Sequence, residues 1–296
     1  VAPQLAKLGD RRFESFDLAK VNACDLVFLA LPHGESAALI AQLAPSLKVV
    51  DLGADFRLTS AEKWAQYYGG THAGTWTYGL PELPGNRAVI AKSTRVANPG
   101  CYATSISLAI APALTLIDTS DIVVVAASGT TGAGRSAKVN LLGSEVMGSL
   151  SSYKFGGVHQ HTPEIEEALS HAAGSEVKIS FTPILAPMPR GILSTVTAKL
   201  TTTATTETVH SLYTTAYVAD EFVTVLPIGQ MPKTNSVVGS NHIHLQVAVD
   251  PHTNRLIISA AIDNLGKGAA AQAIQNANLI CGFVENAGLQ VSGLGV

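Results

Sequence analysis

The sequence is poor in charge and lacks the long segments typical of membrane or nucleic-acid-binding proteins. Only 14% of its 296 residues are charged, against about 25% in average soluble domains, and the formal net charge is -3. No lysine or arginine run exceeds two residues, and no apolar stretch reaches the roughly 18 residues of a spanning helix. We therefore expect no nucleic-acid or membrane partner, and a cytoplasmic enzyme acting on small molecules.

Cysteine is scarce and scattered. Cys24, Cys101 and Cys281 lie far apart without CxxC spacing, so neither a disulfide scaffold nor a zinc site is predicted. His242 and His244 share one face of a predicted strand, but no third ligand lies nearby in the sequence. We expect no metal site.

Apolar residues are abundant, at 47%, and their pattern predicts two kinds of sheet. In the first half, continuous apolar strands such as 25–31 and 121–127 alternate with helices, which indicates a doubly wound parallel sheet. In the second half, β-rich runs at 193–200 and 242–249 partly alternate between apolar and polar residues, as antiparallel strands do. We predict an α/β fold: a partial Rossmann-type doubly wound sheet plus an α+β domain with a mostly antiparallel sheet.

The sequence also makes predictions about one strand and about the start of one helix. Strand 25–31 has the composition of a central strand with parallel neighbours on both sides, but only 24 residues precede it, fewer than the roughly 30 of a βαβ unit. Either it is an edge strand or the chain has lost its amino-terminal part. A helix is predicted to begin with Thr162 as N-cap and Pro163 in its first turn.

Cys101 is the first chemical candidate. In Asn98-Pro-Gly-Cys101 it falls at the start of a predicted helix, where free N–H groups and the helix dipole lower a thiol's pKa. The alternative is a buried structural cysteine, and this motif alone does not decide between the two.

A nucleophilic cysteine needs a base, and the segment Gly156-Gly-Val-His-Gln-His161 offers two histidines. In an extended chain His159 and His161 point to opposite sides, so only one is expected to face a given site.

Anion-binding turns are the third feature. Residues 128–134, Ser-Gly-Thr-Thr-Gly-Ala-Gly, follow a buried strand, where α/β folds place ligand-binding turns. Arg190, between prolines and Gly191, suits bidentate capture of phosphate or carboxylate, and Asn264 is placed to orient a ligand. For Asp51 to Arg57 we favour an internal Asp–Arg ion pair. These residues support acyl transfer through a thioester, but leave reduction and hydrolysis of that thioester open.

Eight motifs in order resemble those of the N-acetyl-γ-glutamyl-phosphate reductase family, within the semialdehyde dehydrogenase superfamily. They run from about residue 20 to residue 290, and are LALPHG, DLGADFRL, YGLPEL, NPGCY, SGTTGAGR, GVHQHTPEI, PMPRGI and AIDNLGKGAAAQA. The resemblance implies NADPH-dependent reduction of an acyl phosphate to an aldehyde in arginine biosynthesis, by a homo-oligomer (dimer or tetramer). It also implies an NADP-binding part at 1–100, a catalytic and dimerisation domain at 101–266, and a helix returning to the first part at 267–296.

The same resemblance assigns roles to individual residues. Cys101 is the expected nucleophile, His159 the general acid/base, and Arg190 and Asn98 the substrate-binding residues. The expected cofactor-binding residues are Pro32, His33, Gly34, Ser128, Gly129, Gly132, Gly134 and Asn264.

One departure from the family is large. Its members open with a strand and a glycine-rich turn of the type GASGYAG, which holds the cofactor diphosphate, and nothing before residue 25 matches it. By analogy with the family, we expect that an amino-terminal part of about 60 residues is absent, including the turn that places backbone amides and a helix N-terminus against the cofactor diphosphate. Weak cofactor binding and low turnover of this chain alone would follow.

Three alternatives stay open at this point. One is a cysteine-dependent acyl hydrolase or acyltransferase, which would not need the SGTTGAG turn. A second is an enzyme like aspartate-semialdehyde dehydrogenase, which shares the fold and the cysteine. The third is an inactive chain that serves only as a dimerising or binding module.

Overall fold

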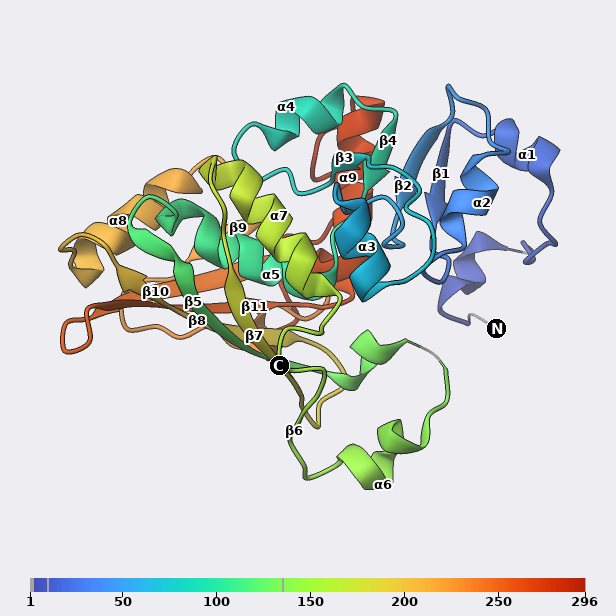
Figure 1. The fold of residues 1–296 in the computed structure, drawn as a ribbon. Coiled ribbons are helices and arrows are strands. Elements are labelled where there is room, and N and C mark those ends of the chain that lie inside the picture. Colours follow the sequence, from blue (N-terminus) through green and yellow to red (C-terminus); the bar gives the residue numbers. More distant parts are fainter. Residues whose placement is uncertain (1–2, 10, 135, 296) are drawn as a thin grey trace.

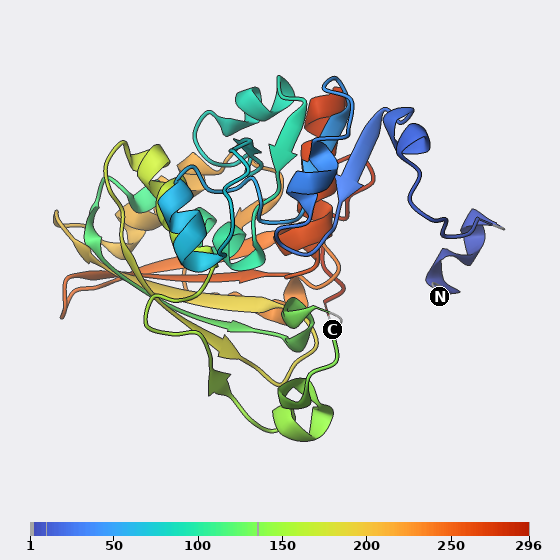
Figure 2. The same cartoon turned by 45° about the vertical axis from the view of Figure 1, so that its right-hand side comes forward.

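The chain folds around two sheets that lie side by side (Figure 1). The computed structural model describes residues 3–9, 11–134 and 136–295. A four-stranded sheet has the order β1-β2-β4-β3, and a seven-stranded sheet has the order β6-β7-β5-β8-β11-β10-β9. Figure 2 shows the smaller sheet beside one end of the larger, with residues 3–9 and 11–17 extending away from both.

The four-stranded sheet is parallel throughout. Its strands are short, and helices of five to seven residues connect or precede them. The elements are α1 (Leu18–Asn22), β1 (Leu26–Leu29), α2 (Ser36–Ile40), β2 (Lys48–Asp51), α3 (Ala61–Tyr67), β3 (Thr77–Tyr78), α4 (Asn86–Ala91) and β4 (Arg95–Ala97).

The seven-stranded sheet is mostly antiparallel: β8 pairs antiparallel with both β5 and β11, and β10 with β11, while β5–β7 and β9–β10 are parallel. This confirms the predicted pairing of a parallel sheet with a mostly antiparallel one. Its strands are β5 (Ile117–Ser128), β6 (Ser151–Ser152), β7 (Ile179–Leu185), β8 (Ile192–Leu200), β9 (Val223–Val225), β10 (Ile243–Asp250) and β11 (Arg255–Ile262).

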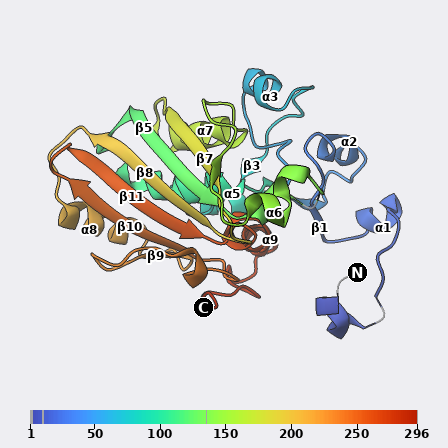
Figure 3. The same ribbon diagram turned by 90° about the horizontal axis from the view of Figure 1, so that it is seen from below.

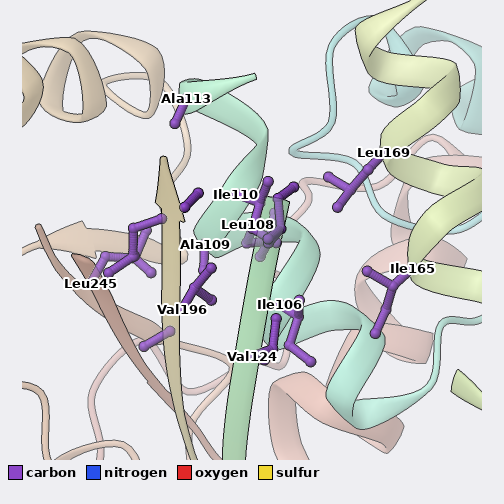
Figure 4. Close-up of a cluster of buried hydrophobic side chains, with 14 of the residues drawn as sticks. Ile106, Leu108, Ala109, Ile110, Ala113, Val124, Ile165, Leu169, Val196 and Leu245 are labelled. Carbon is purple, nitrogen blue, oxygen red and sulfur yellow. The ribbon is translucent and has the colours of Figure 1, made fainter. Parts of the chain in front are cut away.

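Helices cover one face of this sheet, as the view from below shows (Figure 3). They are α5 (Cys101–Ile110), α7 (His161–Ala173) and α8 (Thr206–Ala216); the short α6 (Gly143–Val146) lies on a separate excursion between β5 and β6. Burial alternates along β8, because side chains of a strand point alternately to the helices and away from them. Residues such as Ile106 of α5, Val124 of β5 and Ile165 of α7 form the shared core (Figure 4).

The chain returns to the first sheet at its carboxyl end. A π-helical segment, η6 (Gly266–Ala270), leads into α9 (Ala271–Cys281). Ala273, Ala277 and Ile280 of α9 pack against β2 and α4 residues, among them Val50 and Ile90. Within the segment 267–296, where a closing helix is expected, the α-helix therefore ends at Cys281 and is preceded by a π-helical turn.

The structure bears on two boundary expectations. β1 pairs with β2 alone within the described chain and lies at the sheet edge, which is one of the two alternatives given for strand 25–31; its Phe28 is 45% exposed. The helix predicted to follow Thr162 begins at His161, with Gln160 as N-cap in helical geometry. Pro163 still stands in its first turn, where its missing N–H costs nothing.

Candidate active site

Cys101 lies where the two sheets meet. β4 ends at Ala97, and the extended Gly100 is the N-cap of α5, so that Cys101 is the first helical residue. The Gly100 N–H donates to Oε1 of Glu164, at 2.8 Å. A carboxylate from α7 thus satisfies a backbone donor at this helix start, where negative charge is favoured.

Glu164 is itself fully engaged. Its Oε1 also accepts from the Tyr78 hydroxyl at 2.8 Å, and its Oε2 accepts from Arg57 Nη1 at 3.2 Å. Both side chains of the Arg57–Glu164 pair are at most 5% exposed. The expected Asp–Arg pair within residues 51–57 is therefore wrong: Arg57 reaches across to α7, and Asp51 accepts from Ser36 Oγ and the Gly53 N–H.

The expected lowering of the Cys101 pKa is also wrong. Burial raises the pKa of this thiol to about 11, against smaller lowering effects of the Tyr102 N–H and the Arg57 charge. Desolvation disfavours the thiolate more than the helix start stabilises it. The thiol is protonated in this state, and its activation requires a proton acceptor.

Two histidines supply such acceptors, and both lie on the same side. The rings of His159 and His161 are 4.9 Å apart between centroids, and both line one cavity with Cys101. The expectation that they diverge fails because Gln160 is in helical rather than extended geometry. Burial lowers the pKa of each to about 3, so both rings are neutral near pH 7.

The two rings differ in their surroundings. His159 Nδ1 accepts from the His161 backbone N–H at 3.1 Å, so neutral His159 carries its proton on Nε2. The His161 ring lies directly against Gly100, because a Cβ on Gly100 would be only 2.4 Å from His161 Nε2. His161 is thus next to the residue that precedes the thiol.

The cavity around Cys101 has a volume of about 710 Å³. Its walls come from the turn after β5, the excursion around α6, and the start of α7. Residues that line it include His33, Cys101, Ser128, Gly129, Gly132, Lys138, Tyr153, Lys154, His159 and His161. Of the predicted cofactor-binding residues, His33, Ser128, Gly129 and Gly132 are thus brought together with both predicted catalytic residues.

The remaining residues of the two predicted cofactor turns have mainly backbone roles. Gly34 is in the left-handed region at φ 92° and donates its N–H to Asp55, while the Pro32 carbonyl accepts from Glu35. Gly134, at φ 81°, ends the 128–134 turn.

Asn264 is buried and holds the 128–134 turn, which forms part of the cavity wall. Its Oδ1 accepts from the Gly191 N–H at 2.7 Å, and its Nδ2 donates to Thr131 Oγ1 at 3.1 Å. Instead of pointing freely at a ligand, as expected, the side chain ties the turn to the start of β8.

The two predicted substrate-binding residues are engaged in contacts within the chain. Arg190 forms a two-point ion pair with Asp263, at 3.1 and 2.6 Å. Asn98 is 1% exposed; it donates to the Ala269 carbonyl and accepts from Asn276. The rigid loop around Arg190 does fix a guanidinium as predicted, but on an internal carboxylate, and Asn98 anchors η6 and α9.

In the three described ranges, no three His, Cys, Asp or Glu residues are grouped so that they could bind a metal ion. Those ranges also contain no helix with the length and hydropathy needed to span a bilayer.

Known proteins match this chain along nearly its whole length. The semialdehyde dehydrogenase NAD-binding domain matches residues 1–93, and the semialdehyde dehydrogenase dimerisation domain matches residues 101–264. An N-acetyl-gamma-glutamyl-phosphate reductase from Acidothermus cellulolyticus is 58% identical over 99% of this chain and 86% of its own length. The chain belongs to the N-acetyl-γ-glutamyl-phosphate reductase family. Relatives of that name from Frankia casuarinae and Streptomyces avermitilis are 55% and 52% identical, with the same two coverages.

Solved structures confirm the fold of this family member. Aspartate semialdehyde dehydrogenase II from Vibrio cholerae has a TM-score of 0.66 at 17% identity, covering 90% of this chain and 81% of its own. A probable aspartate-semialdehyde dehydrogenase from Pseudomonas aeruginosa has a TM-score of 0.67 at 17% identity, with the same coverages. The dimerisation domain indicates a homo-oligomer.

Sequence reasoning missed three side chains of this site. Glu164 was visible only as an acidic residue near a helix start, a position typical of dipole compensation. Lys138 and Lys154 stand singly in loops, and no local pattern marks them; only the fold brings them to the cavity.

Proposed function

We propose that this chain catalyses the NADPH-dependent reduction of N-acetylglutamyl 5-phosphate to the 5-semialdehyde, with release of phosphate, as a step of arginine biosynthesis. The names of the relatives support this reaction. The observation that carries it is the cavity in which Cys101, two neutral histidines and the 128–134 turn meet. Oligomer size (dimer or tetramer) and a cytoplasmic location stay predictions.

The 128–134 turn fits the nicotinamide end of a dinucleotide. Gly132 faces the cavity between Ser128 Oγ and Asn264 Nδ2, where a Cβ would be 3.3 and 3.7 Å from those atoms. A side chain there would fill the space, so glycine keeps it open for a planar ring. Ser128 and Gly129 would hold the group from β5, and His33 would lie beside it from β1. When bound, NADPH supplies the hydride that reduces the acyl group; its choice over NADH is part of the proposal.

Cys101 acts as the nucleophile. Its thiol proton passes to His161, whose ring lies against Gly100. The sulfur then attacks the acyl carbon, the bond from that carbon to the phosphate oxygen breaks, and phosphate leaves with its electron pair. The product of these steps is a thioester on Cys101.

His159 serves as the general acid/base. With Nδ1 occupied by the His161 N–H, its Nε2 proton is the one available for donation. We assign it to the oxygen of the tetrahedral species, and the proton that His161 received from the thiol replaces it, since the two rings are 4.9 Å apart between centroids; no imidazolate is then left. As the aldehyde forms and the C–S bond breaks, the oxygen gives up its proton and the sulfur regains one, so that both histidines end neutral, as burial favours.

A two-direction assay tests this function. The chain is incubated with NADPH and the acyl phosphate, and with NADP, phosphate and the semialdehyde, while NADPH absorbance and free phosphate are followed. We expect equal amounts of NADPH oxidised and phosphate released, and none of either with Cys101→Ser. Phosphate release without NADPH oxidation would show a thioester hydrolase instead, and activity retained by Cys101→Ser would remove the nucleophile assignment.

A further inference from the structure

The proposed substrate carries phosphoryl and carboxylate groups, yet two arginines near the site are already neutralised. Arg57 is paired with the buried Glu164, and Arg190 with the buried Asp263. Arg57 makes one hydrogen bond to Glu164 and Arg190 makes two to Asp263, so a carboxylate already compensates the charge of each guanidinium. The cavity therefore needs another source of positive charge.

Lys138 and Lys154 are the basic residues among those described that line the cavity. Lys138 lies on the excursion before α6, whereas Lys154 follows β6 on the way to α7, and both are exposed. In the described part of the chain neither forms an ion pair. Their charges are therefore available to a bound anion.

The backbone conformation of Lys154 and a hydrogen bond of its ammonium group fix its position. Its backbone has φ 42°, one of two non-glycine residues with positive φ in the described chain, a conformation that L side chains rarely adopt. Its Nζ donates to Gln160 Oε1 at 2.6 Å, between the two catalytic histidines in sequence. A neutral amide fixes the ammonium group without cancelling its charge.

The positive charge of Lys154 affects the pKa of all three histidines that line the cavity. Burial is the main cause of the lowered pKa of His159, His161 and His33, and the Lys154 charge lowers each of them further. Lys154 thus lies within electrostatic range of every histidine that lines the cavity.

We propose that Lys138 and Lys154 together bind an anionic oxygen group of the substrate in the cavity that Cys101 lines, and so favour anionic over neutral acyl substrates. This assignment rests on the proposed function and replaces the anion-binding role predicted for Arg190. The substrate has two anionic groups that the lysines could bind, the phosphoryl group and the carboxylate. The protection experiment described below distinguishes them.

Alkylation of Cys101 tests the lysines without cofactor or turnover. In a Cys24→Ser/Cys281→Ser background Cys101 is the one remaining thiol of the sequence. Its rate with anionic iodoacetate is divided by its rate with neutral iodoacetamide. We expect Lys138→Gln and Lys154→Asn each to lower this ratio about threefold or more, and the double variant about tenfold, as expected for lost charge attraction near a surface.

The choice of variants separates charge from backbone. Asparagine tolerates positive φ better than most residues, so Lys154→Asn removes the charge and keeps the turn, while Lys154→Arg should restore the ratio. Lys178→Gln, at an exposed ion pair with Glu176, should leave it unchanged. A ratio unchanged in the double variant overturns the proposal.

Protection identifies the group that is bound. Inorganic phosphate or N-acetylglutamate is added while iodoacetamide reacts with Cys101, and the protecting concentration is compared between the parent and the double variant. Protection by phosphate assigns the phosphoryl group, and protection by N-acetylglutamate the carboxylate; in either case the double variant should need more. No protection by either, or equal protection in the double variant, overturns the proposal. If the ratio falls but NADPH is never oxidised, the lysine assignment stands and the reductase function fails.

Discussion

The thiol of Cys101 is less acidic than its position at a helix start suggests, and this has a consequence for pH. Because burial raises its pKa to about 11, the thiolate fraction should keep rising well above pH 9. We predict that, in the Cys24→Ser/Cys281→Ser background, alkylation by iodoacetamide accelerates steadily from pH 7 to pH 10. A plateau near pH 7 would contradict this, since it would indicate a thiolate stabilised before substrate binds.

The nucleophile itself gives the simplest residue-level prediction. Cys101→Ser should abolish turnover, whereas Cys24→Ser, exposed on the surface, and Cys281→Ser, in α9, should retain most of it. A Cys101→Ser chain with more than about a tenth of the parent rate would have lost less than roughly 1.4 kcal/mol of transition-state stabilisation. That is too little for the loss of a covalent nucleophile.

Turnover and Cys101 alkylation should distinguish the roles of the two histidines. His161→Gln removes the base next to the thiol, so it should slow both turnover and Cys101 alkylation. His159→Gln should lower turnover by about 10²- to 10⁴-fold, the range for a general acid/base, with alkylation nearly unchanged. Alkylation that depends on His159 and not on His161 would reverse the two roles.

At the scale of elements, the contact between η6 and α5 positions the nucleophile. A Cβ on Gly268 would lie 2.8 Å from the Cys101 Cβ and 3.2 Å from its Cα, closer than atoms can pack. Gly268→Ala should therefore shift Cys101, slow its alkylation, and cost about 1–3 kcal/mol of unfolding free energy, as overpacking does. Gly143→Ala is the matched control, because its Cβ would meet only Met147 Sδ at 3.7 Å. Equal effects of the two substitutions would refute a special role for Gly268.

Elements were predictable from the sequence where local pattern decides them. The apolar run within β5 and the alternation along β8 follow from burial of one or both faces of a strand. Contacts across long separations were not predictable. Glu164 binds the Gly100 N–H from 64 residues away, and Arg190 finds Asp263 from 73 residues away. Which carboxylate an arginine meets is decided by the packing of sheets, and it decides in turn whether that arginine is free for substrate.

The whole molecule is joined by a buried polar network between its two sheets. Lys267 of η6, 0% exposed, donates to Glu82 Oε1 at 2.5 Å and to Gln275 Oε1 at 2.8 Å. Glu82 comes from the loop between β3 and α4, and Gln275 from α9. On the other side, Asn241, just before β10, donates to the same Gln275 oxygen at 2.8 Å. The network thus fixes the segment that carries Gly268 between the two halves of the chain.

Removing one charge from this network should destabilise the entire fold. Lys267→Met leaves Glu82 buried and unpaired, which costs about 3–5 kcal/mol, and urea denaturation should show the loss in one transition. The double variant Lys267→Met/Glu82→Gln removes both charges and should recover much of that loss, because no ion is then left without a partner. Lys178→Met, at an exposed pair with Glu176, should change stability by less than about 0.5 kcal/mol. If Lys267→Met were as mild as Lys178→Met, or the double variant were no more stable than the single one, the pair would not be what holds the two sheets in register around Cys101.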